Sequence, residues 1–441
     1  MAKPGGGRRP RVVRFRLRNG LRVLLAPNAG SPTASVWVWY GVGSKNEHPG
    51  ITGASHWVEH MLFQGSPKFA KGEIDRAVVK VGGNLNAFTD YDFTAYFSTV
   101  PRDRLAVPLA IEADRMTRAL LEDREVERER TVIRSEREGN ENWPEFRVAE
   151  ELGELAYRRH PYRWDPLGFP EDLDHLTPAD LRAYYRRFYG PRNAVLVVTG
   201  GFSPAELRRT IRSRFGGLPA LGDDPTVSVV EPEPVGERRS KLTGPGTTPY
   251  VEVGYRAPAV DDPRTPSVIL LDVILGGETR LFTVGRGWGS SSEHPSARIY
   301  RALVDSGLAV QASTQFRPRR YPGMFLIGAQ ASGGVELARL EAAIHRETSR
   351  LARSPPSQSE VGEARTKIRR GAELAYEGAT GTGFRLGYYA MLGGPRFEAE
   401  LLRAVLRVTP SEIRASAAKL FAPARRVVVG YEPAPEAPHA A

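Results

Sequence analysis

Two of the eight histidines in this 441-residue chain stand close together, in the segment Gly53-Ala-Ser-His56-Trp-Val-Glu59-His60. On a helix, Glu59 and His60 project from the same face as His56, because they follow it by three and four positions. Two imidazoles one turn apart can both ligate Zn²⁺. The carboxylate between them is badly placed as a third ligand but well placed to polarise a water on the metal. This H-x-x-E-H order, the inverse of H-E-x-x-H, predicts a hydrolytic zinc site.

A catalytic zinc site needs a third protein ligand, and the sequence offers two candidates. Glu129 and Glu136 are seven positions apart, which places them two turns apart on one helical face. One of them can bind the metal while the other orients a histidine or the water. Taken alone, the Arg- and Glu-rich segment around them is more typical of a solvent-exposed helix with surface ion pairs.

The composition narrows the chemistry further. The chain has no cysteine, which excludes disulfides, thiolate nucleophiles, zinc fingers and iron–sulfur clusters. A bound metal must therefore be held by histidines and carboxylates. The net charge is +11, but six basic residues and no acidic ones lie in residues 1–16. A basic arm can contact phosphates, but without a base-reading motif we expect a solvated arm and no nucleic-acid partner.

No apolar stretch approaches the roughly 18–20 residues that a membrane-spanning helix needs. The basic N-terminus leads into Gly and Pro rather than into the apolar core of a secretory signal. We therefore expect a cytoplasmic protein without a membrane partner.

Local patterns predict the elements around the motif. Asn19-Gly20 predicts a two-residue hairpin turn, because both residue types accept positive φ. Helices are expected near Gly53–Gln64, Glu73–Val81 and Arg102–Asn140. Strands are expected at Val12–Leu17, Leu21–Leu25, Ala34–Tyr40, Phe93–Val100 and Ala194–Thr199.

An internal repeat indicates two domains. Residues 176–197 align without gaps on residues 408–429, at a constant offset of 232, and both copies contain Thr-Pro followed by a helical pattern. Two α+β domains of similar topology explain this match, and a chance resemblance of two helix starts is the alternative. We expect a basic flexible arm at 1–10, an N-terminal domain with the metal motif at 11–217, and a Pro- and Gly-rich linker at 218–249. A homologous domain without the motif follows at 250–431, with a disordered tail at 432–441.

Over nearly its whole length the chain resembles the pitrilysin/insulinase family of inverted-motif zinc peptidases, which includes mitochondrial processing peptidases and bacterial homologues. The motif His56–His60 followed by Glu136 carries the resemblance. It extends to the Asn19-Gly20 hairpin, Tyr40-Gly-Val-Gly-Ser, Gly82-Gly83-Asn-Leu-Asn-Ala-Phe-Thr, the helix of Glu129 and the segment Phe188–Thr199.

The resemblance implies a zinc-dependent endopeptidase that hydrolyses peptides or unfolded segments, with one zinc per chain. It places the zinc on His56, His60 and Glu136, and makes Glu59 the general base and Glu129 an acid behind the ligands. The implied fold is two homologous α+β domains, each a mostly antiparallel sheet packed with helices, closing as a clamshell around a chamber. A non-catalytic assembly subunit of the same family is the alternative.

The resemblance also implies a substrate-binding edge strand at Asn86, Ala87, Phe88 and Thr89. An extended peptide would pair with this strand through backbone hydrogen bonds. The alternative is an ordinary strand that leads into the turn Asp90-Tyr-Asp92.

One feature departs from the family pattern. Members often carry an Arg and, seven residues later, a Tyr in the second domain, whereas this chain has Leu303 and Val310 at those positions. Arg298 or Arg301 could substitute, and a Gly/Ser-rich stretch at 285–292 interrupts the approach to this segment. We therefore expect a homodimer, or a heterodimer with a homologous non-catalytic subunit that carries the missing Arg/Tyr pair.

Overall fold

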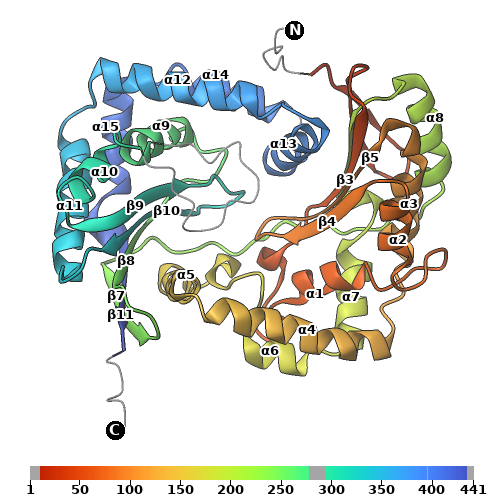
Figure 1. Ribbon diagram of the computed structural model, residues 1–441, viewed down its shortest axis with the longest axis horizontal. Coiled ribbons are helices and arrows are strands. Elements are labelled where there is room, and N and C mark those ends of the chain that lie inside the picture. Colours follow the sequence, from red (N-terminus) through yellow and green to blue (C-terminus); the bar gives the residue numbers. More distant parts are fainter. Residues whose placement is uncertain (1–9, 278–293, 395, 435–441) are drawn as a thin grey trace. The chain divides into compact units, whose positions relative to one another are not determined.

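The computed structural model describes residues 10–277, 294–394 and 396–434 (Figure 1). Three predicted segments lie wholly or mostly outside the described residues. They are the basic arm at 1–10 except for its last residue, the Gly/Ser-rich stretch at 285–292, and most of the tail at 432–441. Within the described residues, no helix combines the length and apolarity needed to cross a membrane.

The first sheet has six strands in the order β1-β2-β6-β3-β5-β4. The pair β2/β6 is parallel and the other pairs are antiparallel. The strands are β1 Val13–Arg16, β2 Arg22–Pro27, β3 Thr33–Tyr40, β4 Asn84–Thr89, β5 Thr94–Pro101 and β6 Ala194–Gly200. The outermost strand on one side is therefore β4, the strand predicted to bind substrate.

The second sheet repeats this arrangement with five strands in the order β7-β11-β8-β10-β9. Its parallel pair is β11/β7, and its other pairs are antiparallel. The strands are β7 Arg238–Gly244, β8 Tyr250–Arg256, β9 Ala309–Phe316, β10 Met324–Ala331 and β11 Arg426–Pro433. This order matches β2-β6-β3-β5-β4 position by position, so the expected fold class of two similar α+β domains with mostly antiparallel sheets is confirmed.

Helices surround both sheets. The first eight are α1 Ala54–Met61, α2 Glu73–Lys80, α3 Ala106–Arg118, α4 Asp123–Glu141, α5 Pro144–Ala156, α6 Pro170–His175, α7 Pro178–Phe188 and α8 Pro204–Phe215. The others are α9 Thr265–Gly276, α10 Arg298–Leu303, α11 Leu337–Arg353, α12 Gln358–Leu374, α13 Ala379–Leu392, α14 Phe397–Val405 and α15 Pro410–Leu420. The repeated segment forms α7 with β6 and α15 with β11, and both helices begin with a capping box, at Thr177 and Thr409.

Three local predictions were wrong in detail. The helix expected over residues 102–140 is broken between α3 and α4, where Leu121 has a φ of 45°. The Asn19-Gly20 hairpin exists, but its strand pairing ends at Arg16 and Arg22, so the loop is longer than two residues. Of its two predicted turn residues, only Gly20 has positive φ. The buried amide of Asn19 instead donates to the carbonyl of Phe215 at 2.7 Å.

The predicted linker at 218–249 also needs correction, because it contains β7. Residues 218–237 and 245–249, on either side of β7, have neither helix nor strand. The structure also divides into two compact units that are not contiguous in sequence, unlike the predicted domains. One compact unit comprises residues 1–137, 164–229 and 373–397, and the other comprises 138–163, 230–372 and 398–441.

Each unit therefore includes one helix from the other half of the chain. Helix α13 packs on β3 and β6 of the first sheet, and α5 packs on β7, β8 and β11 of the second. The two helices are repeat equivalents, since residues 144–156 plus the offset of 232 give 376–388. Gly383 and Gly387 allow the close approach of α13, because a Cβ there would meet the indole nitrogens of Trp37 and Trp39 at 2.3 and 2.0 Å.

Candidate metal centre

The helix that carries the motif, α1, begins at a position that only glycine suits well. Gly53 is its N-cap with a φ of 87°, and a Cβ there would meet the carbonyl oxygen of Leu167 at 2.9 Å. The buried carboxylate of Glu47 accepts hydrogen bonds from the backbone N–H of Gly53 at 2.9 Å and of Ser55 at 2.8 Å. An acidic group on the free N–H groups stabilises a helix start. The position of His56 is thereby fixed in its first turn.

The structure brings the three predicted metal ligands together. The Nε2 atoms of His56 and His60 are 3.2 Å apart. The Oε2 atom of Glu136, on α4, lies 3.7 Å from the first and 3.5 Å from the second. These three donor atoms lie within 4.8 Å of one another and form the one such cluster found among the described residues. Two imidazole nitrogens and one carboxylate oxygen are a donor set that catalytic zinc uses, so the residues present fit the metal.

Glu129 contacts one of the predicted ligands, His60. Its Oε1 atom lies 2.9 Å from Nδ1 of His60. Because a carboxylate can only accept, this contact assigns the proton of the neutral ring to Nδ1, so the neutral ring has its Nε2 lone pair facing the cluster. The second oxygen of Glu129 accepts from the amide of Gln64 at 2.9 Å. Sequence reasoning missed Gln64, although its position four residues after His60 was a usable signal.

The ionisation of the cluster reflects its burial and crowding. Burial, together with the neighbouring His60, lowers the pKa of His56 to about 4. Burial also opposes protonation of His60, but hydrogen bonds to Glu129 and Glu136 outweigh it and raise its pKa to about 9. The same bond to His60 lowers the pKa of Glu136. A ligating imidazole is neutral, so zinc binding has to displace the second ring proton that the raised pKa retains on His60.

Glu59 lies on the same helix and is 7% exposed. Its Oε2 atom accepts a hydrogen bond from the hydroxyl of Thr89 at 2.5 Å. Burial raises the pKa of Glu59 to about 7, although the bond to Thr89 acts in the opposite direction. A carboxyl group with a pKa near neutrality is suited to accept a proton and return it.

The predicted substrate strand is β4, and it pairs with β5 alone among the described strands. Asn86 is exposed on this edge. The ring of Phe88 packs against Trp39 with centroids 5.6 Å apart, and Ala87 packs against the first core. Thr89 has a role that the sequence did not suggest, since its hydroxyl binds Glu59. Peptide binding by these four residues stays a prediction.

The second sheet has a partial counterpart of this arrangement. Helix α9 lies against the edge strand β9, as α1 lies against β4. A buried carboxylate on α9, that of Asp272, accepts from the hydroxyl of Thr314 at 2.6 Å. The pair resembles Glu59 and Thr89 in chemistry, but α9 contains no histidine. The second sheet therefore keeps the carboxylate and hydroxyl without the metal ligands.

The residues at the family's Arg/Tyr positions do not offer a replacement. Leu303 is fully buried and Val310 is exposed. Of the two arginines considered as substitutes, Arg298 donates to both oxygens of Glu360, at 2.7 and 2.9 Å. Arg301 is exposed on α10. Because Arg298 is already committed to Glu360, it is a poor candidate for holding a substrate carbonyl.

A pair of similar α+β units, with H-x-x-E-H on a helix of the first and a downstream glutamate completing the cluster, defines the class of inverted-motif zinc peptidases. The comparison with known families agrees with this assignment. A family model described as Insulinase (Peptidase family M16) matches residues 22–165, and one described as Peptidase M16 inactive domain matches residues 175–368. The chain belongs to this family.

Individual relatives support the same conclusion. The zinc protease PqqE of Helicobacter pylori is 28% identical over 358 residues, which cover 80% of this chain and 77% of that protein. The beta subunit of the mitochondrial-processing peptidase of Blastocladiella emersonii is 25% identical, over 92% of this chain and 85% of that protein. The crystal structure of a protease from Helicobacter pylori superposes with a TM-score of 0.89 at 25% identity, covering 96% of this chain and all of that one.

Proposed function

We propose that this protein is a zinc-dependent endopeptidase that hydrolyses peptides or unfolded polypeptide segments. The observation that carries the proposal is the convergence of His56, His60 and Glu136 within 4.8 Å, beside the buried carboxyl of Glu59. When bound, Zn²⁺ supplies Lewis acidity that polarises a carbonyl and makes water nucleophilic near neutral pH.

The protein's own groups would divide the remaining work. Glu59 is the general base that accepts the proton of the attacking water and returns it to the leaving amine. The hydroxyl of Thr89 holds this carboxyl in place from the end of β4. Glu129 fixes the ring of His60 through Nδ1. The exposed edge of β4 at Asn86 offers backbone groups to an extended peptide.

The test compares metal content and peptide hydrolysis in the wild type and in Glu59→Gln. We expect about one zinc per chain in both proteins, because Glu59 is not among the clustered donor atoms. Hydrolysis should be abolished in the variant and, in the wild type, on chelation. A matched control is Glu206→Gln, an exposed glutamate in the first turn of α8, which should keep full activity. Hydrolysis that survives in Glu59→Gln would refute the mechanism.

A dependence on a partner subunit is a second proposal, motivated by Leu303 and Val310. The relative named as the beta subunit of a processing peptidase has a name that describes one part of a larger enzyme. We propose that this chain is the metal-bearing member of a dimer and that a homologous subunit supplies the missing carbonyl-binding groups. Hydrolysis is then measured for the chain alone and with a co-expressed homologous subunit. Full activity of the chain alone would reject the need for a partner, whereas zinc binding without hydrolysis in either case would favour the assembly-subunit alternative.

A further inference from the structure

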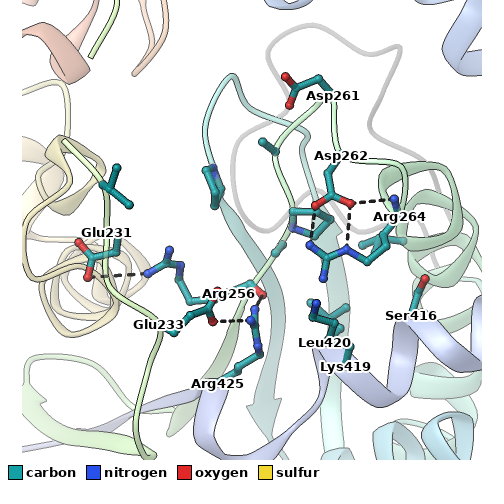
Figure 2. Close-up of a pocket in the computed structure, with 16 residues that line it drawn as sticks. Glu231, Glu233, Arg256, Asp261, Asp262, Arg264, Ser416, Lys419, Leu420 and Arg425 are labelled. Atoms are coloured by element: carbon teal, nitrogen blue, oxygen red, sulfur yellow. Dashed lines mark hydrogen bonds and ion pairs between the residues drawn. The ribbon is translucent and has the colours of Figure 1, made fainter. Parts of the chain in front are cut away.

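A pocket of about 450 Å³ in the second unit is lined by charged groups that pair with one another (Figure 2). Arg264 donates to Asp262 through Nε at 2.9 Å, and Arg425 pairs with Glu233. Because these basic groups lie beside acidic ones, the lining favours neither an anionic nor a cationic ligand. The metal centre of the first unit, in contrast, has a buried carboxylate whose effect on a predicted ligand can be measured.

Three residues of the candidate site stand on one short helix. Helix α1 has eight residues and carries His56, Glu59 and His60. A helix of about two turns is not stable by itself in water, so its surroundings must hold it in place. His56 is only the third residue of this helix, and helix ends are the parts that fray first. The position of this predicted ligand therefore depends on how the first turn is held.

The first turn of α1 is capped from outside the helix. Its N-cap is Gly53, which has no side chain that could accept from the free N–H groups. The two oxygens of Glu47 accept one N–H each, from Gly53 at 2.9 Å and from Ser55 at 2.8 Å. Glu47 is 4% exposed, so water hardly competes for these bonds. Hydrogen bonds to an ionised acceptor are among the strong ones, so this carboxylate is the main support of the helix start.

The residue next to the predicted ligand is held on a second side as well. The hydroxyl of Ser55 lies 2.7 Å from that of Tyr184 on α7, and both side chains are buried. Ser55 directly precedes His56, so a shift of its backbone would move the imidazole. The Nε2 atom of His56 lies 3.2 Å from that of His60 and 3.7 Å from Oε2 of Glu136. A small displacement of the first turn would therefore change the spacing of all three donor atoms.

A different carboxylate holds the loop before α1 without contacting the helix. Asp172 of α6 accepts from the N–H groups of Gly50 at 3.0 Å and Thr52 at 3.1 Å, and from the hydroxyl of Thr52 at 2.6 Å. Neither donor residue belongs to α1, which begins at Ala54. Asp172 thus matches Glu47 in the kind of bond it makes and in its place in the fold, but not in its contact with the first turn.

We propose that Glu47 is a positioning residue of the metal centre, which sets the position of His56 before a metal binds. The inference rests on the proposed function for the identity of the metal. Without this carboxylate, the first turn of α1 would become ordered only when zinc binds. The cost of ordering it would then reduce the affinity for zinc. The loss of a helix cap typically changes an equilibrium constant by about five- to tenfold.

The test measures the zinc dissociation constant of the wild type, Glu47→Gln and Asp172→Asn by competition with a chromophoric chelator. Glutamine is similar in size, but its amide group can accept only one of the two N–H groups. We expect Glu47→Gln to weaken zinc binding about tenfold and to change the visible absorption bands of the Co²⁺-loaded protein, which report the ligand geometry. Asp172→Asn should keep the wild-type affinity and bands. Both variants should have a lower urea midpoint, so stability alone does not separate them.

A second variant, Glu47→Asp, keeps the charge but is one methylene too short to reach both N–H groups. It should weaken zinc binding about threefold, and it replaces Glu47→Gln in the test if that variant does not fold. A folded variant of Glu47 that binds zinc as tightly as the wild type would overturn the inference, and so would an equal loss of affinity in Asp172→Asn. A wild type that binds no zinc would refute the proposed function and this inference with it. Unchanged affinity in a Glu47 variant of a zinc-binding protein would refute the inference alone.

Discussion

The two ring nitrogens of His60 have different environments, and this difference matters most for the metal site. Nδ1 faces Glu129 at 2.9 Å, whereas Nε2 faces His56 and Glu136. A carboxylate behind a metal-binding histidine fixes its tautomer and increases the basicity of the ligating nitrogen. We therefore propose that the buried Glu129 supports the site, although its oxygens do not belong to the cluster of donor atoms.

We predict that Glu129→Gln weakens zinc binding by about 10- to 100-fold, the usual cost of removing such a carboxylate. The amide oxygen can still accept from Nδ1, but the negative charge is lost. The zinc dissociation constant, measured by competition with a chromophoric chelator, checks this prediction. Glu127→Gln, on the same helix but 54% exposed, is the matched control. Equal zinc affinity in both variants would show that Glu129 has no such role.

The contact between Thr89 and Glu59 leads to a second prediction. Thr89→Val removes the hydroxyl while keeping the shape of the side chain, so the buried carboxyl loses its bound donor. We expect kcat to fall about tenfold, which is ~1.4 kcal/mol in the barrier, with KM and zinc content unchanged. Thr89→Ser retains a hydroxyl and should restore most of the rate. A wild-type rate in Thr89→Val, or a rate in Thr89→Ser as low as in Thr89→Val, would contradict this assignment.

The site residues that could be predicted from spacing alone are those that lie within one or two helical turns of each other in the sequence. His56, Glu59 and His60 share one helical face, so their types and positions were sufficient. Spacing alone left the choice between Glu129 and Glu136 open, because both lie on one helical face, and only the family resemblance assigned the metal to Glu136. The fold shows which oxygen meets which nitrogen. The bond from Thr89 to Glu59 joins residues 30 positions apart, and no local pattern reports the approach of β4 to α1.

Among the elements, β8 is unusual because this central strand of the second sheet buries a carboxyl group that has no hydrogen-bond partner among the described residues. Glu252 is fully buried, and neither of its oxygens has a hydrogen-bond partner among the described residues. Burial raises its pKa well above the usual value.

We predict that Glu252→Gln changes the pH dependence of stability. A carboxyl with a raised pKa stabilises the fold fully below its unfolded pKa of about 4.3. That contribution is lost as the pH rises toward the folded pKa, because the unfolded state ionises first. The wild type should therefore lose stability between pH 5 and pH 8.5 more steeply than the variant, as measured by urea midpoints. Glu336→Gln, an exposed change at the start of α11, should follow the wild type. Parallel profiles for Glu252→Gln and the wild type would contradict the prediction.

The elements that sequence patterns located well were those with strong end signals. The Thr-Pro starts of α7 and α15 were found because a hydroxyl cap and a proline at the first position are local features. The break near Leu121 was not found, because the Arg- and Glu-rich pattern continues across it. Strand β7 was predicted to be part of a linker because its sequence is polar. It forms a strand because it pairs in parallel with β11, which lies almost 190 positions later in the chain, and no local pattern reports such a distant partner.

At the scale of the whole molecule, the repeat explains the exchange of helices between the two halves. The equivalent helices α5 and α13 are related by the offset of 232. Helix α5 comes from the N-terminal half of the chain and packs on the second sheet, whereas α13 comes from the C-terminal half and packs on the first sheet. Helix α13 covers the fully buried Trp37 and Trp39 of β3, and Phe384 lies against both rings. Burying such aromatic surface contributes several kcal/mol. Neither half of the sequence therefore contains all of its own core.

This arrangement predicts that the chain divided between Val229 and Val230 gives two fragments that need each other. The cut lies at two exposed residues without helix or strand. Alone, residues 1–229 leave Trp37 and Trp39 uncovered and should aggregate, whereas the co-expressed fragments should co-purify as one complex. Gly383→Ala should weaken this association, because a Cβ would meet the ring of Trp37 at 2.3 Å, and Gly381→Ala should not, because its nearest neighbour is 3.6 Å away. A soluble fragment 1–229 that unfolds cooperatively by itself would show that the exchanged helix is dispensable.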